Sequence, residues 1–428
     1  VIGLASFMAT VITYRALDQE FLTDEDKGWM FCFVIAPEGA TSEYTDRMIK
    51  KMEGFVAETP EVQAYAGIVA LAMAGPGQAN QGIMFVNLKQ GPRRSVQDIV
   101  TEPGGLSEKF FNNVEGAIAI ANLPKALDRS FAAPYQLVLQ GQDLSALNED
   151  SAKLANKLRQ AGFLRPQSVR SSFEVNKPQL RLTINRNRAA ALGVSIEDIS
   201  RTLQILFGGL DLSRIKVAGK EYEVIAQLER LARLTPQDLD RLYVRNAAGE
   251  LIQLSGLVTR EAGPAPNVIE HYSRLRSATI SGSPFGVPIG TAMAKTEELL
   301  AAEGLPVGFS YRWEGEARDL QTAGREVWWV FILAIIIVYM VLAAQFESLI
   351  HPFTVMLAVP LAGLGAFGLL WLLDFGAKLG FYKAIPGMNV NLFSQIGLIL
   401  LVGLVTKNSI LLVEFANQQR QKGLNAHD

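Results

Sequence analysis

One charged residue interrupts an apolar segment near the end of the chain. Residues 392–413 (LFSQIGLILLVGLVTKNSILLV) contain a single ionisable side chain, Lys407, followed by Asn408 and, two helical turns later, by Glu414. A cation inside a membrane helix costs about 2.5–3.5 kcal/mol on insertion scales, and residues of this kind generally serve a proton or ion path or the docking of helices. Lys407 therefore indicates a transporter rather than an anchored enzyme, unless its amine extends to the membrane surface along its aliphatic stem.

The composition indicates membrane spans together with a large aqueous domain. Of the 428 residues, 49% are hydrophobic, and the mean hydropathy of +0.18 is too apolar for one ordinary soluble domain. The net charge is only −2, so we expect no nucleic acid as a partner. The single cysteine, Cys32, cannot form an internal disulfide. Three scattered histidines suggest neither a metal site nor a catalytic base, so we expect no enzyme activity and no cofactor.

Three segments near the end of the chain have the length and composition of membrane helices. They are residues 323–346, 353–374 and 392–417, each with an apolar core near the 20 residues that a crossing requires. The connection between the first two segments, residues 347–352, is short. The two segments are therefore predicted to pack as an antiparallel hairpin. Pro360 is predicted to kink the second segment.

The first residues of the chain are apolar but too few for a complete span. Residues 1–16 lack the basic start of a signal peptide and fall short of a membrane thickness. We expect them to be the second part of a truncated transmembrane helix, and the whole sequence to be a fragment.

The long segment between these helices alternates strand and helix patterns. Strands are predicted at 29–36, 62–69 and 82–88, with helices at 42–56 and 96–111. The cycle recurs with strands at 135–140, 168–174, 276–282 and 308–313 and helices at 144–161 and 291–302. Repeated β-α-β units of this kind predict α+β sandwiches of the split β-α-β type. Residues 179–263 break the cycle and are predicted to form a separate subdomain inserted into the second sandwich.

Four stretches resemble, in the same order along the chain, segments of resistance-nodulation-division (RND) efflux pumps of the AcrB/MexB type. They are FLTDEDKG (21–28), ALGVSIEDI (191–199), LAAQFES followed by PFTVMLAVPL (342–348 and 352–361), and GLVTKNSILLVEFA (403–416). The resemblance implies an α+β membrane protein with transmembrane helices, periplasmic porter subdomains and an inserted docking subdomain. The implied parts are 1–16, the end of helix seven; 17–127, a first porter subdomain; 128–178 with 264–316, a second; 179–263, the docking subdomain; and 323–346, 353–374 and 392–417, helices eight to ten.

The same resemblance implies roles for individual residues. Lys407 is similar to the lysine that pairs with two aspartates of helix four to relay protons, and that helix is not in this sequence. Residues 66–82 resemble a switch loop between two drug pockets, with Gly67, Gly75, Pro76 and Gly77 as its flexible positions. An ordinary flexible loop is the alternative interpretation of this stretch.

The implied substrate contacts lie near that loop and at an outer cleft. They are Leu71, Met73, Phe85, Tyr65 and Arg170. Ala119 and Ala121 stand where the family can carry pocket-entrance phenylalanines, which implies a cleft with an altered lining. Core positions for Phe85 and Tyr65, and a solvated surface position for Arg170, are equally compatible with the sequence.

The resemblance also implies a setting and partners. The chain would lie in a bacterial inner membrane with its large domain in the periplasm, as part of a homotrimer that meets a periplasmic adaptor and an outer-membrane channel. The main hypothesis is proton-driven export of amphipathic compounds. One alternative is copper or silver export, because Met30, Met73 and Met84 are soft ligands near Cys32. Another is a translocation or assembly module that does not transport.

Overall fold

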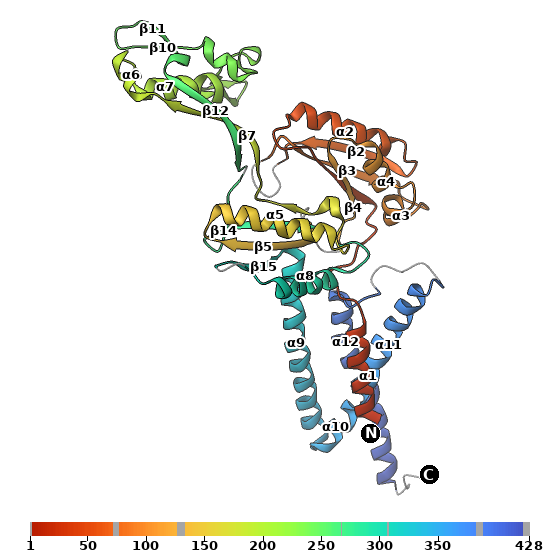
Figure 1. The fold of residues 1–428 in the computed structure, drawn as a ribbon. Helices are drawn as coiled ribbons and strands as arrows, with labels where there is room; N and C mark the ends of the chain where they lie inside the picture. Colours follow the sequence, from red (N-terminus) through yellow and green to blue (C-terminus); the bar gives the residue numbers. More distant parts are fainter. Residues whose placement is uncertain are drawn as a thin grey trace. The chain divides into compact units, whose positions relative to one another are not determined.

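The computed structural model describes residues 2–71, 77–125, 133–266, 268–305, 308–381 and 388–422 (Figure 1). The chain forms two compact units. The smaller unit is Val175–Asn267, and the larger one consists of Val1–Glu174 together with Val268–Asp428.

The larger unit contains an antiparallel sheet with the strand order β2-β3-β1-β4. Its strands are β1 (Trp29–Ile35), β2 (Val62–Val69), β3 (Gln81–Leu88) and β4 (Ile118–Asn122), and its helices are α2 (Ser42–Ala57), α3 (Val96–Thr101) and α4 (Leu106–Asn113). Helix α2 joins β1 to β2, while α3 and α4 join β3 to β4, so the sheet has the split β-α-β order that the sequence predicts. Met30, Cys32 and Met84 pack on the helix-covered face of this sheet.

The helix predicted over residues 96–111 is two helices. α3 ends at Thr101 and α4 begins at Leu106, with Pro103, Gly104 and Gly105 between them. The single-helix prediction is therefore wrong. A proline disfavours the helical conformation of the residue before it, and Glu102 has an extended ψ of 155°. Gly104 then takes a φ of +76°, which ends the helical path.

A second sheet in the larger unit repeats the topology of the first. Its strands are β5 (Tyr135–Gly141), β6 (Arg170–Ser171), β13 (Glu270–Tyr272), β14 (Leu275–Gly282) and β15 (Ser310–Glu314), and its helices are α5 (Leu144–Gln160) and α8 (Ile289–Glu303). β14 pairs with β5 and β6, and β5 pairs with β15, so the order β6-β14-β5-β15 matches that of the first sheet. The strand predicted over 168–174 is only two residues long, because Pro166–Ser168 forms a 3-10 turn.

The smaller unit has its own core and its own strand pairs. Its elements are β7 (Val175–Ile184), α6 (Arg186–Ala191), α7 (Ile196–Leu203), β8 (Leu210–Val217), β9 (Lys220–Ala226), β10 (Tyr243–Arg245), β11 (Leu251–Gln253) and β12 (Val258–Pro266). β7 and β12 form an antiparallel ribbon, β8 pairs with β9, and β10 pairs with β11. Ser195 caps α7, since its hydroxyl accepts a hydrogen bond from the Asp198 amide at 3.0 Å. Ile199, Leu239 and Leu254 are fully or nearly fully buried in this core.

Five further helices carry the apolar segments. They are α1 (Ile2–Ala16), α9 (Gly315–Phe346), α10 (Ile350–Met356), α11 (Ala358–Lys378) and α12 (Leu392–Gln421). Among the described residues, three stretches are long and apolar enough to cross a membrane: Gly315–Phe346, Ile350–Lys378 and Leu392–Gln419. These stretches agree with the three spans predicted from the sequence.

The second predicted span is broken, and it does not form a hairpin with the first. α10 ends at Met356, four residues before Pro360, whose ring would clash with that carbonyl in a continuous helix. The helix is interrupted at Leu357, three residues before Pro360, where the sequence predicts a kink. α11 packs along α1 and α12 rather than along α9, so the predicted antiparallel hairpin is wrong. Thr10 of α1 donates a hydrogen bond to the Pro360 carbonyl oxygen at 3.0 Å, which helps to hold α11 against α1.

Candidate functional site

Lys407 lies midway along α12, a helix whose start is fixed by a reciprocal cap. The Ser394 amide donates a hydrogen bond to Asn391 Oδ1 at 3.0 Å, and the Asn391 amide donates one to Ser394 Oγ at 2.9 Å. Such a capping box satisfies two backbone donors at the end of a helix. The helix then continues without a break past Lys407 to Gln421.

α12 uses one face for packing and presents Lys407 on another. Val402 and Thr406 are buried, and the Thr406 hydroxyl donates to the Val402 carbonyl oxygen at 2.9 Å. Lys407 and Asn408 are exposed. A Cβ added to Gly403 would meet nothing within 4 Å. Within the described residues Lys407 makes no ion pair.

Two residues predicted to line a drug pocket lie on opposite faces of the first sheet. In the antiparallel register Tyr65 is opposite Val86, which packs under the helices, whereas Phe85 is opposite Ala66. Directly paired residues point to the same side of a sheet. Tyr65 therefore belongs to the helix-covered side and Phe85 to the open side, and the structure does not bring them together.

The face of the first sheet away from its helices, here called the open face, carries a row of aromatic side chains whose central ring, Phe31, is buried. Trp29, Phe31 and Phe33 alternate along β1, with ring centroids 6.0 Å apart for the first pair and 5.4 Å apart for the second. Phe85 lies beside this row because it is the cross-strand partner of Phe31. Aromatic rings in such contact form a broad apolar surface. The alternating aromatics of WMFCFVI were the sequence signal for this surface, and the sequence interpretation did not use it.

Gly67, predicted as part of a switch loop, is a strand residue. It lies in β2, where a Cβ would come within 2.5 Å of Ile49 Cγ2 and 2.9 Å of Glu53 Oε1 on α2. This glycine therefore permits close packing of a helix on a strand, and it does not supply loop flexibility.

The connection between β2 and β3 is shorter than the predicted loop. It begins at Ala70, which has a φ of +56°. Leu71 and Gly77 are exposed, so the Leu71 side chain is accessible to a ligand. Three other predicted residues lie outside the described residues: Met73, Gly75 and Pro76.

Ala119 and Ala121 do not line the open face. Ala121 is opposite Cys32 and Ala119 is opposite Val34, and both alanines pack with the helix-covered core. The expectation that they shape a cleft is therefore wrong for the described structure. Their strand presents Ile118 and Ile120 to the other side, because neighbouring residues of a strand alternate.

Arg170 lies in β6 at the edge of the second sheet and is partly covered. Burial lowers the pKa of its guanidinium below the usual value, while the carboxylates of Glu174 and Glu38 act in the opposite direction. A partly covered guanidinium with carboxylates nearby can anchor a polar group of a ligand. Arg170 belongs to a different sheet from Phe85 and Leu71.

The sulfur atoms considered as soft metal ligands are core atoms. Met30, Cys32 and Met84 are completely buried, and Cys32 is opposite Met84 in the sheet. Burial raises the pKa of the Cys32 thiol to about 12, which keeps it from becoming the thiolate that binds metals. Met73 lies outside the described residues.

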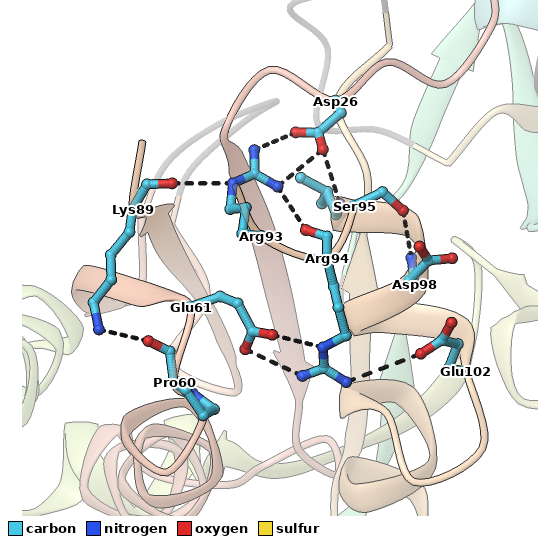
Figure 2. A network of polar contacts seen from close by, with 10 residues as sticks. Asp26, Pro60, Glu61, Lys89, Arg93, Arg94, Ser95, Asp98 and Glu102 are labelled. Carbon is cyan, nitrogen blue, oxygen red and sulfur yellow. Dashed lines mark hydrogen bonds and ion pairs between the residues drawn. The ribbon is translucent and has the colours of Figure 1, made fainter. Parts of the chain in front are cut away.

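Two arginine–carboxylate pairs connect segments that flank the strands of the first sheet (Figure 2). Both terminal nitrogens of Arg93 donate to the Asp26 carboxylate, at 2.9 and 2.6 Å. Arg94 donates to the Glu61 carboxylate through Nε at 2.6 Å and through Nη2 at 3.1 Å. Asp26 also accepts the Val96 amide at the start of α3, so one carboxylate joins the segment before β1 to the segment after β3. The acidic run DEDK at 24–27 was the sequence signal for this contact.

The whole chain matches one family model. Residues 1–428 align with the AcrB/AcrD/AcrF family. The match spans both compact units and the three candidate membrane helices.

Curated relatives carry names of transporters. The chain is 29% identical to an uncharacterized transporter of Haemophilus influenzae over 97% of its length, and 30% identical to the toluene efflux pump membrane transporter TtgB of Pseudomonas putida, also over 97%. It is 29% identical to the multidrug export protein AcrF of Escherichia coli over 96%. It covers only 39%, 38% and 39% of these relatives, so it spans about two-fifths of their length. From the match over its full length we conclude that the chain belongs to the AcrB/AcrD/AcrF family of membrane transporters.

Proposed function

We propose that the protein containing this chain exports hydrophobic and amphipathic compounds from a bacterial inner membrane in exchange for protons. The observation that carries the proposal is Lys407, an exposed ammonium midway along an apolar helix without an ion pair among the described residues. A charge held at such depth needs a neutralising group. Protons supplied to that group provide a physical means of driving transport.

The chemistry of a lysine-carboxylate pair suits this role. A carboxylate beside Lys407 keeps the ammonium charged, and protonating that carboxylate removes the attraction between the two groups. The pair then has two states, and proton binding shifts the balance between them. The two helix-four aspartates expected from the family resemblance are the proposed partners.

The substrate class is proposed from the aromatic surface and from the relatives. Phe33 and Phe85 are partly exposed beside the buried ring of Phe31 on the first sheet, and Leu71 is exposed just after β2. Pockets for amphipathic ligands are apolar with few polar anchors. Relatives named for toluene efflux and multidrug export support substrates of this kind. Arg170 and the connection that includes Met73, Gly75, Pro76 and Gly77 are proposed as further substrate contacts.

The partners are proposed with the family as their basis. Residues 17–127, and 128–178 with 264–316, would be porter subdomains in the periplasm. Residues 179–263 would dock to a periplasmic adaptor and an outer-membrane channel in a homotrimeric pump. The compact unit Val175–Asn267, which has its own core, supports a separate docking role for this part.

The decisive experiment measures dye accumulation in cells that carry the native protein. Lys407→Ala is expected to raise accumulation to the level of cells without the pump, because the relay loses its cation. Leu404→Ala is the matched control, since Leu404 is 61% exposed and lies on the same helix three residues earlier. This control should keep efflux at the native level.

Two readouts make the result interpretable. Membrane levels of each variant are measured by immunoblot, so that loss of protein is separated from loss of transport. Native efflux by Lys407→Ala at equal protein level would contradict the proposal. An unchanged phenotype when the whole protein is removed would instead favour a translocation or assembly module.

Copper or silver export is the less supported alternative. The buried positions of Met30, Cys32 and Met84 offer no exposed sulfur cluster on the described part of the first sheet. Copper sensitivity of the same strains tests this alternative directly. A copper phenotype that is lost in Met30→Leu and Met84→Leu variants would favour it.

A further inference from the structure

The segment that joins α1 to β1 is tied by its backbone to two other helices. The Glu20 amide donates to the Val390 carbonyl oxygen at 3.1 Å, and the Val390 amide donates to the Asp18 carbonyl oxygen at 2.9 Å. The Leu392 amide donates to the Phe21 carbonyl oxygen at 3.2 Å, at the first residue of α12. The Gly290 amide of α8 donates to the Gln19 carbonyl oxygen at 3.2 Å. This connecting segment, residues 17–28, therefore holds the start of the Lys407 helix.

Charged groups from three distant parts of the chain meet at this segment. Lys125, which follows β4, lies 2.8 Å from the Asp24 carboxylate and 3.7 Å from the Glu316 carboxylate in the first turn of α9. Its ammonium also donates to the Leu22 carbonyl oxygen at 3.3 Å. Glu316 is only 9% exposed, so the attraction between these charges is weakly screened by water.

Glu20 adds a third carboxyl to this cluster. The groups that face it are Lys125, Asp24, Glu316 and the side chain of Asn389, which precedes α12. α8 contacts the preceding residue instead, through the Gly290 amide and the Gln19 carbonyl oxygen. One ammonium cannot neutralise three carboxylates, so ionising all of them leaves two uncompensated negative charges in a poorly solvated place. Protonating one carboxyl lowers this electrostatic cost.

We propose that Glu20 is a proton-binding site that works as a latch: protonated, it holds the connecting segment against the start of α12, and ionised, it releases it. The neutral carboxyl stays beside Asn389 and Lys125. The ionised carboxyl is repelled by Asp24 and Glu316 and lowers its free energy by moving into water. Release breaks the backbone hydrogen bonds of Glu20, Val390 and Leu392. The latch concerns this chain's own contacts and does not depend on the proposed role of Lys407.

The titration of Glu20 falls in the range where such a latch would operate. Burial raises the pKa of Glu20 from 4.5 to about 7, Asp24 and Glu316 raise it further, and Lys125 and Asn389 oppose the rise. Burial acts to lower the pKa of Lys125, but Glu316 and Asp24 hold it above its usual value, so the ammonium stays charged.

Hydrogen exchange of the native protein in detergent or nanodiscs tests the latch. Protection of the Glu20, Val390 and Leu392 amides is compared at pH 6 and pH 8 after correction for intrinsic exchange. A carboxyl with a pKa near 7 when held and near 4.5 when released makes release about tenfold more favourable at pH 8. We expect an approximately tenfold loss of protection. In Glu20→Gln the loss should disappear, whereas Glu25→Gln, an exposed neighbour on the same segment, should retain it.

Two further variants give shifts of opposite sign, which a merely structural role would not produce. Lys125→Gln removes the cation that favours ionised Glu20, so the pH of release should move upward. Asp24→Asn removes a repelling charge, so the pH of release should move downward. Because these variants keep Glu20, they decide the question even when Glu20→Gln fails to fold.

The outcomes are distinct from those of the export experiment. Equal protection at pH 6 and pH 8 in the native protein overturns the latch. So does a pH response that persists in Glu20→Gln, or a shift in the same direction for Lys125→Gln and Asp24→Asn. Lys407→Ala should leave the exchange response unchanged, so a failed export proposal and a failed latch give separate results.

Discussion

Phe85 and Tyr65 show how much the face of a side chain matters at the scale of single residues. Both lie near the middle of the paired strands β2 and β3, at neighbouring register positions, and both are large and partly exposed. Only Phe85 adjoins the aromatic row of β1. A ligand on the open face of the sheet would therefore contact Phe85 and not Tyr65.

This difference predicts distinct drug spectra for two alanine variants. Phe85→Ala is expected to change susceptibility to bulky aromatic compounds several-fold, because it removes a ring from the open face, with a smaller effect on compact substrates. Tyr65→Ala, the matched control on the opposite face, should leave the spectrum unchanged. Minimum inhibitory concentrations across a panel of compounds measure both. A larger change for Tyr65→Ala than for Phe85→Ala would rule out the open face as the contact surface.

The sequence shows the type of each residue, but it does not show which face of the sheet a side chain occupies. Lys407 and Phe85 are recognisable because a charge in an apolar segment and an aromatic in a strand have known meanings. The face of Tyr65 depends on a register shift between Val62 and Ala64, and a shift of one residue reverses every side chain after it. Such a bulge has no signal in this strand's residues.

At the scale of elements, the connecting segment has two anchors with different responses to acid. At its end, Asp26 is held by Arg93 and by the amides of Gly28 and Val96. The hydrogen bonds from Arg93 hold the pKa of Asp26 below its ordinary value, although partial burial acts against them. Its contribution to stability is therefore present above about pH 3.8 and is lost only as the pH falls further.

Removing the Asp26 carboxylate should lower the local stability of the segments that it joins, before β1 and after β3. Asp26→Ala is expected to cost about 1–2 kcal/mol of local stability, because two guanidinium and two amide donors lose their acceptor. Asp46→Ala is a matched control, since Asp46 forms an exposed pair with Lys50 at 2.6 Å within α2 and should cost less than about 0.5 kcal/mol. Exchange of the Gly28 and Val96 amides at pH 5 and pH 7 measures both variants. Asp26→Ala with native protection at these amides would contradict the assigned role.

Most elements could be predicted because their patterns are local. The strands β1, β2, β3 and β5 and the helices α2 and α5 follow from alternation, helical spacing and caps. The break at Pro103 was overlooked because apolar spacing continued across it. The packing of α11 on α1 could not be predicted, since it depends on contacts between segments about 350 residues apart, such as that of Thr10 with Pro360.

The charge cluster at Glu20 could not be predicted from local patterns either, because it also depends on contacts between distant segments. Glu20, Lys125 and Glu316 belong to three segments that only the folded chain brings together. Each residue alone has the pattern of an ordinary surface charge. Their combination gives a site that composition and motif spacing do not reveal.

At the scale of the whole molecule, the smaller unit begins and ends in a single ribbon. Val175 and Pro266 are cross-strand partners at one end of the β7–β12 pair, so their Cα atoms lie only about 5 Å apart. The core of the smaller unit is formed by its own residues, and the two sheets of the larger unit have separate cores. The larger unit does not need residues 176–265 to complete those cores.

This arrangement predicts that the smaller unit can be removed without unfolding the larger one. Replacing residues 176–265 with about four Gly and Ser residues should leave Cys32 unreactive toward maleimide at pH 7.5, because its thiol remains buried. Deleting residues 175–220 instead removes β7 and leaves β12 without its partner strand, so the rest of the smaller unit should unfold. Mass spectrometry of the Cys32 peptide measures the labelling in both. Rapid labelling after the clean replacement would show that the larger unit depends on the smaller one.

The paired ends of the ribbon also bear on how such a chain arises. The second sheet has the strand order of the first, and its second and third strands are separated by the smaller unit rather than by a short turn. A single insertion between two neighbouring residues of a duplicated unit would be enough to give this architecture. Recombination can then exchange the inserted coding segment between lineages while the reading frame and the surrounding fold persist.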